Sequence, residues 1–478
     1  MVRLALLLMI PCSVLLTLAA GQPAFDTIGY TTRDRQVYGP AIRYIVNDTL
    51  RGVHAVWKDS MGIIRYNFRP RRGVWRWPEG TPVSDYPRNL GGLDVDIAKG
   101  QAMISCDYLA RGTPTISFFR DSSVGQGRFQ ESNITTGYRE CLVGTTTYGW
   151  YKFMATRNES LFFLGMIGRQ TVGPIGPFPG GNLAVSKQIG RYGCIWVRSD
   201  EYGRQKLYLR QTPNNGQTWY ATACLSDSVP SYLSRSMLGG CATYDSIRLH
   251  LVADFYDGEN ANHSQLWYYC PQSAPAWSLV HEYVCPESTR VGELALAACR
   301  PSIGIDRRRQ RLYVVWEQFD PDNVEPLTGL ARADIWARRS DDLGATWSSP
   351  VRLTQPDGTS KRFPSLAEVV DDTLHVLYFA DQVAGCWEQG EGPQTNNAVV
   401  YLRCAWIWPG SVAESCPGPG RTASTRSAVR RTNAPDLSPI VAYNPAGRRV
   451  QSLTAPGVYF VTEKTGGGMR VERVVLVR

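Results

Sequence analysis

Six arginines stand near the starts of successive strand-like units of the chain, and their recurrence suggests a shared binding role. They are Arg43, Arg88, Arg139, Arg235, Arg300 and Arg362. A guanidinium presents a rigid fork of donors that matches a carboxylate, so arginines gathered around one opening would bind an acidic ligand. Alternatively, some of them point outward or pair with carboxylates of the protein itself. Candidate partners are Asp94, Asp96, Asp306 and Glu368.

Acidic residues also recur, at the end of the second strand-like run of several units. These are Asp59, Asp254, Glu317 and Asp381. Carboxylates in equivalent positions could line a groove or the mouth of a channel. Because Asp and Glu often end strands for structural reasons, the pattern by itself identifies no catalytic acid or base.

No pattern in the sequence predicts a metal or a cofactor. The acidic segments Asp94-Val-Asp96 and Asp320-Pro-Asp-Asn323 lack the spaced oxygen ligands and central glycine of a calcium-binding loop. The histidines and cysteines show no zinc-ligand spacing. There is also no phosphate-binding glycine loop, nucleophile elbow or HExxH segment. We therefore expect neither a metal nor a cofactor.

The elements that must position these residues form a loose repeat of roughly 50 residues. The clearest unit contains Arg300–Asp306, Leu312–Glu317 and a third run that begins at Asp334. Short strands with one apolar face are unstable alone, but sheets arranged radially in a ring bury those faces against each other. We therefore predict an all-β protein, a β-propeller of four-stranded blades over residues 21–416. The repeats predict seven blades, but the unit near Arg139 is poorly defined, so six blades remain an alternative.

Two turn sequences follow strand-like runs and fit tight hairpins. One is Ser340-Asp-Asp-Leu-Gly-Ala-Thr-Trp347 and the other is Thr212-Pro-Asn-Asn-Gly-Gln-Thr-Trp219. Glycine supplies the positive φ of a tight turn, Asp or Asn can bond back to the turn backbone, and Trp can cover the hairpin. The structural residues predicted here are Ser340, Asp342, Gly344, Thr346, Trp347, Asn214, Gly216, Thr218 and Trp219.

These turns resemble the Asp box of sialidase-type β-propellers. The resemblance implies that the boxes brace blades away from the substrate, that three arginines hold a carboxylate, and that a Tyr–Glu pair with an acidic residue performs hydrolysis. The Arg-Ile-Pro element of the first sialidase blade is absent near Arg43, where Ala41-Ile-Arg-Tyr-Ile45 stands. Arg300-Pro301 and Phe363-Pro364 are partial echoes in other units. This departure favours binding over hydrolysis.

The two ends of the chain predict export. Residues 1–20 combine a charged start, an apolar run and small residues, which is typical of a signal peptide. Residues 417–437 have the composition of a linker. Residues 438–478 regain strand character in Tyr443–Val450, Ala455–Val461 and Met469–Arg478. This order resembles a shortened C-terminal sorting domain of bacterial type IX secretion cargo, which implies a secreted or surface-attached bacterial protein. The alternative is a small terminal β-hairpin.

The distribution of charge along the chain limits the classes of partner that the sequence predicts. The net charge is +9, but residues 417–478 contain nine Arg and one Lys against three acidic residues, so the propeller region is nearly neutral. A nearly neutral body argues against nucleic acid as a partner.

One of the 12 cysteines, Cys12, lies in the predicted signal segment, so the rest of the chain has an odd number of cysteines. Export permits disulfides, so we expect a few bridges and at least one free thiol.

The sequence is compatible with three functions. The first is an extracellular binding protein for glycans or surface polymers, without catalysis. The second is an exo-acting, sialidase-type glycoside hydrolase, and the third is a structural surface protein. For all three we expect a monomer without a membrane span, exported through secretion machinery that recognises the C-terminal segment.

Overall fold

The computed structural model describes residues 23–34, 36, 43–88, 92–146, 148–165, 168–174, 181–236 and 238–405, together with strand residues 441–443, 449–450, 457–465 and 468–476. The chain divides into two compact units, Met1–Ala413 and Glu414–Arg478. The predicted signal segment and linker lie outside the described residues. Among the described residues, none of the helices could span a lipid bilayer.

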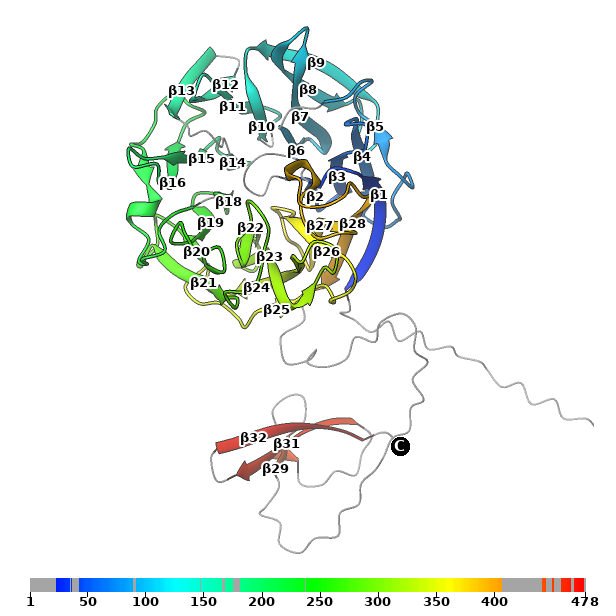
Figure 1. Ribbon diagram of the computed structural model, residues 1–478, viewed down its shortest axis with the longest axis vertical. Helices are drawn as coiled ribbons and strands as arrows, with labels where there is room; N and C mark the ends of the chain where they lie inside the picture. The colour runs from blue at the N-terminus through cyan, green and yellow to red at the C-terminus, as the bar shows by residue number, and fades with distance from the viewer. Residues whose placement is uncertain are drawn as a thin grey trace, which may run out of the picture. The chain divides into compact units, whose positions relative to one another are not determined.

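Seven four-stranded antiparallel sheets form the ring in Figure 1, which confirms the all-β propeller with seven rather than six blades. Blade 1 is β2 (Ile45–Asp48), β3 (Gly52–Lys58), β4 (Ile64–Pro70) and β5 (Thr81–Pro82). Blade 2 is β6 (Leu93–Ala98), β7 (Gln101–Ala110), β8 (Thr113–Asp121) and β9 (Phe129–Thr136). Blade 3, the weak unit of the sequence, is β10 (Arg139–Thr145), β11 (Tyr151–Arg157), β12 (Ser160–Gly165) and β13 (Gly168–Pro174).

The remaining blades follow in chain order. Blade 4 is β14 (Gly181–Val185), β15 (Tyr192–Ser199), β16 (Gln205–Thr212) and β17 (Ala223–Cys224). Blade 5 is β18 (Gly240–Tyr244), β19 (Leu249–Phe255), β20 (His263–Tyr269) and β21 (Trp277–Val284). Blade 6 is β22 (Ala298–Asp306), β23 (Arg311–Val324), β24 (Ala331–Ser340) and β25 (Val351–Arg352). Short 3₁₀ turns lie at η1 (Leu225–Asp227) and η2 (Trp387–Gln389).

Blade 7 closes the ring with a strand from the other end of the propeller sequence. Its inner strands are β26 (Ser360–Leu366), β27 (Thr373–Asp381) and β28 (Asn397–Ala405), and its outer strand is β1 (Ala24–Thr31). β1 pairs with β28 from Ala24↔Arg403 to Thr31↔Asn397, and the two lie side by side in Figure 1. Hydrogen bonds between the two ends of the ring therefore remove the free edge of β28.

The core lies between the blades, as the alternation of apolar residues predicts. Trp57, Trp196 and Trp316 take the same position on the second strands of blades 1, 4 and 6, and are at most 2% exposed. Each fills the space between neighbouring sheets. All ten cysteines of the described residues are free. The expected disulfides are therefore wrong for this part of the chain, where buried side chains rather than cross-links hold the blades together.

The second unit is a separate small sheet. Its strands are β29 (Val441–Tyr443), β30 (Arg449–Val450), β31 (Gly457–Thr465) and β32 (Gly468–Leu476), in the order β30-β29-β31-β32. All its neighbouring strands are antiparallel. The strand character expected after residue 438 is confirmed; the role of this sheet in secretion stays a prediction.

Candidate functional site

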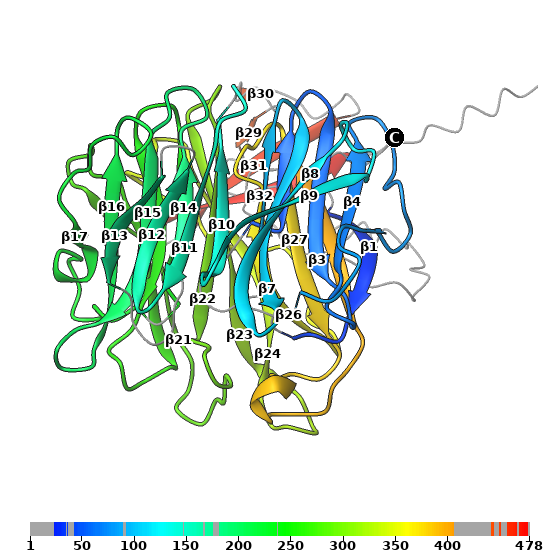
Figure 2. The same ribbon diagram turned by 90° about the horizontal axis from the view of Figure 1, so that it is seen from above.

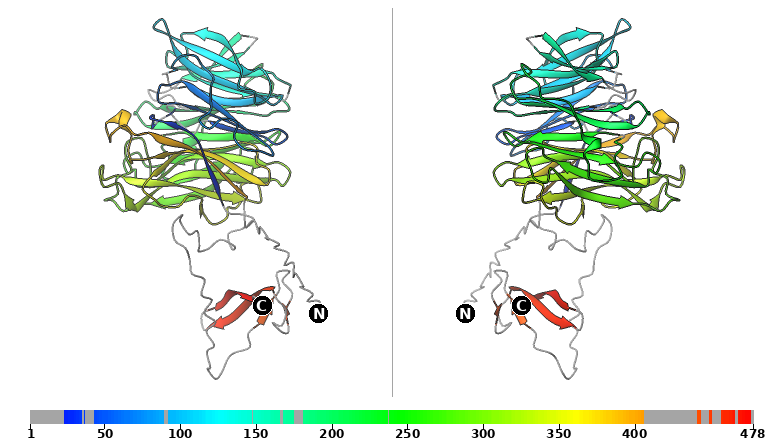
Figure 3. Two further views of the ribbon diagram at one scale, coloured as in Figure 1. Left: turned by 90° about the vertical axis from the view of Figure 1, so that its right-hand side faces the viewer. Right: turned by 90° about the vertical axis from the view of Figure 1, so that its left-hand side faces the viewer.

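The ring has two faces, which carry different connections. The innermost strands of all blades run in the same direction along the channel. Loops between the second and third strands lie on one face, here called the loop face. Turns between the first and second strands, and between the third and fourth strands, lie on the opposite turn face. The ring is seen from its rim in Figure 2, and the yellow-orange loop that contains η2 projects from the loop face in Figure 3.

Arg300 and Arg362 are brought together on one carboxylate near the loop face. Arg300 and Arg362 both form ion pairs with Glu317 Oε1, and the Arg362 Nε distance is 3.3 Å. The Phe363 backbone N–H donates to Glu317 Oε2 at 2.7 Å. Burial by itself would raise the pKa of Glu317, but the charges of Arg300 and Arg362 lower it to about 2. The carboxylate is therefore ionised at neutral pH.

Local backbone geometry explains how these side chains meet. The pairing of β22 with β23 shifts between Cys299 and Ser302, and Arg300 there has φ of 50°. The pairing of β26 with β27 shifts in the same way between Arg362 and Ser365, where Phe363 has φ of 55°. Both shifts are bulges at an x-Pro-Ser segment, and bulges re-aim side chains. The two partial Arg-Ile-Pro echoes of the sequence are thus equivalent bulges, in which Arg300 corresponds to Phe363.

Three further carboxyl groups near this cluster carry raised pKa values. Burial raises the pKa of Asp254 to about 7 and that of Asp381 to about 6. Burial, with a contribution from Asp381, raises the pKa of Asp34 to about 7. Carboxyl groups whose pKa values are pushed apart, such as Asp254 and Glu317, can act as general acid and base. Here both are 0% exposed, so neither offers an atom to a substrate in this structure.

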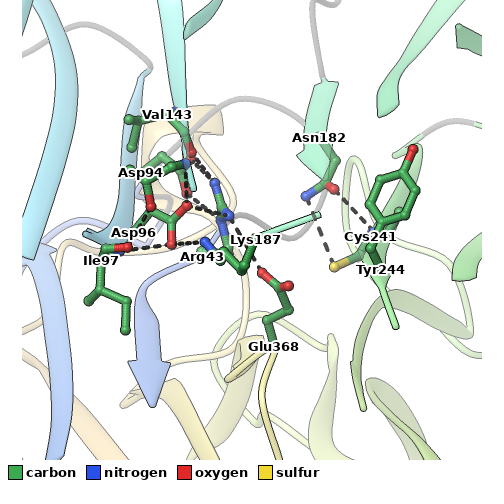
Figure 4. A network of polar contacts seen from close by, with 12 residues as sticks. Arg43, Asp94, Asp96, Ile97, Val143, Asn182, Lys187, Cys241, Tyr244 and Glu368 are labelled. Carbon is green, nitrogen blue, oxygen red and sulfur yellow. Dashed lines mark hydrogen bonds and ion pairs between the residues drawn. The ribbon is translucent and has the colours of Figure 1, made fainter. Parts of the chain in front are cut away.

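Arg43 lies in the channel and is held by the protein's own carboxylates, as the sequence allowed. Its Nη2 is 2.7 Å from Asp94 Oδ2, and its Nη1 is 3.5 Å from Asp96 and 3.8 Å from Glu368 (Figure 4). Lys187 forms a second ion pair with Asp96. Burial raises the pKa of Asp94, whereas for Asp96 the effect of burial is outweighed by Lys187 and Arg43, and its pKa is lowered.

The innermost strands of neighbouring blades belong to separate sheets, and polar side chains along the channel connect these strands. Asp94 accepts the N–H of Val143 at 2.9 Å, and Asp96 accepts that of Thr145 at 2.8 Å. Other blades make the same contact. The Asn182 side chain accepts the N–H of Ala242 at 3.1 Å. The hydroxyls of Ser302 and Ser365 accept the N–H groups of Leu366 and Tyr44, respectively, each at 3.0 Å. Each joins one innermost strand to the next. The channel residues therefore stabilise blade order.

The other three predicted arginines lie apart from these groups. Arg88 is fully buried; its guanidinium lies over the rings of Tyr86 at 4.3 Å and Tyr108 at 3.9 Å and pairs with Glu131 at 2.7 Å. Arg139 is exposed, and Arg235 is half-buried. Of the six arginines, the structure joins only Arg300 and Arg362 on a common partner. A role of the six in ligand binding stays a prediction.

The two predicted box turns have the expected internal contacts on the turn face. Asp342 accepts the N–H of Thr346 at 2.8 Å, and Asn214 accepts that of Thr218 at 2.8 Å. Gly344 has φ of 94°. The box tryptophans also pack on the preceding blade, a contact that was not expected, and the Trp219 ring in addition lies 5.4 Å from the Arg210 guanidinium of its own hairpin. Trp347 meets Tyr268 at 5.6 Å, and Trp219 meets Phe163 at 5.2 Å.

Sequence reasoning missed a repeated His–Tyr pair. The Nδ1 atoms of His54, His250 and His375 lie 2.6–2.7 Å from the hydroxyls of Tyr66, Tyr268 and Tyr401, respectively. The next blade places an aromatic ring on each of these tyrosines: Phe129, Trp347 and Trp75. The signal was the matching position of histidine in the strand segments that begin Val53-His, Leu249-His and Leu374-His. These pairs stabilise interfaces between blades.

The buried His54 predicts a specific pH dependence of stability. Burial lowers its pKa to about 4, so the native ring stays neutral while an unfolded histidine, with a pKa of 6.5, takes up a proton. Stability from His54 is therefore complete above pH 6.5 and is lost as the pH falls toward 4. Between pH 7.5 and pH 5, the unfolding free energies of wild type and His54→Asn should converge by about 2 kcal/mol. A gap that stays constant in urea titrations would contradict this.

The two faces differ in charge. The loops between second and third strands contain nine acidic and two basic residues, whereas the turns between first and second strands contain eight basic and four acidic residues. The basic residues of those turns are Arg51, Lys99, Lys187, Arg191, Arg248, Arg307, Arg308 and Arg309. An acidic ligand is therefore repelled by the loop face and attracted by the turn face.

Known proteins resemble this chain only distantly. No family model and no curated protein matches the chain. A lectin from Burkholderia pseudomallei is similar in structure with a TM-score of 0.44 and 12% identity, over 75% of this chain and 92% of that one. A neuraminidase-like protein of A/flat-faced bat/Peru has a TM-score of 0.38 and 7% identity, over 77% and 97%.

An alpha-L-arabinofuranosidase from Podospora anserina has a TM-score of 0.34 and 10% identity, over 68% of this chain and 93% of that one. At such identities and scores, none of these proteins assigns a function or a site residue to the chain. Strand order, ring closure and channel contacts identify the first unit as a seven-bladed β-propeller.

Proposed function

We propose that the propeller is a monomeric extracellular protein that binds glycans or surface polymers without catalysis. The observation that supports this most is a pair of exposed aromatic rings on the turn face. Tyr148 and Trp150, in the turn between β10 and β11, are 71% and 60% exposed. Such rings pair an apolar face with a polar edge and suit contact with a sugar ring. Lys99 lies beside this turn, 3.5 Å from the position of a Cβ on Gly149.

The buried state of the acid–base groups supports binding rather than hydrolysis. Glu317 is bonded to Arg300, Arg362 and the Phe363 backbone, and has no exposed surface. Hydrolysis of a glycosidic bond needs a carboxyl group in contact with the substrate. The exposed rings of Tyr148 and Trp150 meet the simpler requirement of binding.

Replacing Trp150 should test this proposal. Trp150→Ala is expected to weaken binding to a glycan recognised by the wild type by at least about tenfold, the loss typical of an exposed aromatic contact that dominates an interface. Tyr202→Ala is the matched control, because Tyr202 is 72% exposed but lies in the β15–β16 loop of the loop face. A glycan array followed by calorimetry measures both. Equal affinities of wild type and Trp150→Ala would refute the assignment of this turn.

The hydrolase alternative rests on the opposed pKa values of Asp254 and Glu317. Incubation with a fluorogenic sialoside tests it directly. Turnover by the wild type that is lost in Arg300→Ala would replace the binding proposal with a sialidase-type activity. No turnover and no binding on the array would leave a structural surface protein.

We further propose that the chain is an exported bacterial protein whose C-terminal sheet is read by secretion machinery. The paired strands β31 and β32, which follow the predicted linker, support this. Deleting residues 438–478 should leave the propeller folded and abolish its appearance in the medium or on the cell surface, as measured by fractionation and immunoblot. Normal export of the shortened protein would contradict the proposal.

A further inference from the structure

The turn face has a pocket where blades 6, 7 and 1 meet. Its volume is about 580 Å³, within the range of pockets that hold small ligands. Basic side chains reach it from β4, β28, the start of the loop after β4, and the β22–β23 turn. They are Arg69, Arg71, Arg307, Arg308 and Arg403. His375 completes this wall.

Three of these arginines differ from the paired arginines of the ring. Within the part of the chain that the structure describes, the guanidiniums of Arg69, Arg71 and Arg403 have no hydrogen bond or ion pair. Arg300 and Arg362, by contrast, are bonded to Glu317. An unpaired guanidinium beside a pocket retains its capacity to bind an anion.

Three of the four acidic residues of the same pocket form ion pairs with arginines. Asp48 pairs with Arg51 at 2.9 Å, and Asp306 pairs with Arg309 at 2.9 Å. Asp372 forms ion pairs with both Arg308 and Arg309. Asp371 accepts the N–H of Thr373 at 2.9 Å and keeps its charge, because burial lowers the pKa of His375, 3.8 Å away, to about 4 and leaves that ring neutral. Among the described residues, three unpaired arginines, Arg69, Arg71 and Arg403, therefore face one unpaired carboxylate, and the net charge left in the pocket is positive.

Apolar groups complete the lining. Leu50, Val53, Val369 and Val370 also border the pocket, and Leu50 is 73% exposed. A saccharide combines C–H faces with polar groups, so a wall of aliphatic and guanidinium groups fits an acidic sugar. The fork of an arginine matches two oxygens of a carboxylate or a sulfate.

We propose that this pocket binds the carboxylate or sulfate group of an acidic saccharide, held by Arg69 and Arg403 with Arg71 at the rim. This inference rests on the proposed glycan-binding function and adds the chemical class of ligand and a second site on the turn face. The site is distinct from the Arg300–Glu317–Arg362 cluster, which lies near the other face.

The test uses Arg69→Gln/Arg403→Gln in the full chain. Arg111→Gln/Arg198→Gln is the matched control, because it removes the same charge from one exposed and one half-buried arginine elsewhere. Thermal unfolding confirms that both variants fold. The probes are a heparin-derived disaccharide, a galacturonate oligomer, their neutral counterparts, inorganic sulfate, and vesicles containing phosphatidylglycerol, in about 0.15 M salt.

We expect the Arg69/Arg403 variant to bind the two acidic saccharides at least about tenfold more weakly, and the control less than about twofold. Equal losses in both variants, or no loss in either, would overturn the pocket. Arginine-dependent binding of vesicles or inorganic sulfate without saccharide binding would overturn the saccharide assignment. If Trp150→Ala impairs glycan binding while Arg69→Gln/Arg403→Gln does not, the proposed glycan-binding function is supported and the pocket proposal is refuted. If the wild type binds no saccharide, both proposals are refuted.

Discussion

Deleting residues 24–31 should unfold the propeller or leave it without a cooperative transition. This segment is β1, the outer strand of blade 7, and it pairs with β28 over its length. Its removal exposes the edge of β28 and the space occupied by Ile28, which is 1% exposed. Contacts such as Tyr44 N to Ser365 Oγ still join blades 7 and 1, but the ring loses the strand pairing that ties its two ends together. The expected loss is therefore a large share of the folding free energy of a domain, which is about 5–15 kcal/mol.

Urea unfolding monitored by tryptophan fluorescence, with limited proteolysis, measures this loss. The control is deletion of residues 414–478, which form a separate compact unit and contribute no strand to the ring. The control should shift the transition by less than about 1 kcal/mol. A synthetic peptide of residues 23–34 added in trans should restore part of the signal. An unchanged midpoint after removal of β1 would show that the ring closes by other contacts.

The second large effect is expected for Glu317→Gln. This change keeps the shape of the side chain but leaves Arg300 and Arg362 without their common carboxylate, while both remain at most 6% exposed. Breaking a buried ion pair by removing one partner typically costs about 3–5 kcal/mol, because the remaining charge is uncompensated. The midpoint of urea unfolding should fall accordingly. Asp372→Asn is the control, because its side chain is 69% exposed and surface pairs contribute about 0–1 kcal/mol.

The same substitution has a predicted pH dependence. The pKa of Glu317 is lowered to about 2 in the folded protein from the usual 4.5, so its stabilisation is complete above pH 4.5 and is lost as the pH falls toward 2. The difference in unfolding free energy between wild type and Glu317→Gln should be constant above pH 5 and shrink below it. A difference that persists unchanged down to pH 3 would exclude an ionic origin.

Much of the fold could be predicted from the sequence. The recurring strand pattern and the glycine-containing turns at Ser340–Trp347 and Thr212–Trp219 depend on neighbouring residues, so local spacing revealed the blades and the conformation of both turns. The sequence also offered Asp94, Asp96, Asp306 and Glu368 as possible partners of the six arginines, and in the structure Arg43 pairs with three of them. The sequence did not decide between six and seven blades, because the segment that forms β10–β13 lacks a strong alternation of apolar and polar residues.

The candidate site was harder to predict. Six arginines occupy similar places along the repeats, yet their environments differ because bulges in β22 and β26 re-aim side chains and because Glu317 can face two blades at once. The pocket between blades 6, 7 and 1 combines Arg69 with Arg403, which are far apart in the chain. Sequence spacing contains no information about such a meeting.

The sequence by itself thus determined the strand repeat, the hairpin turns and the all-β class, because these arise from alternation and turn chemistry over a few residues. Only the tertiary structure decided that β1 completes blade 7, that the box tryptophans pack on the preceding blade, and which arginines are neutralised. Those outcomes depend on contacts between residues of different blades or of the two ends of the ring, and only the packing of the blades and the closure of the ring bring these residues together.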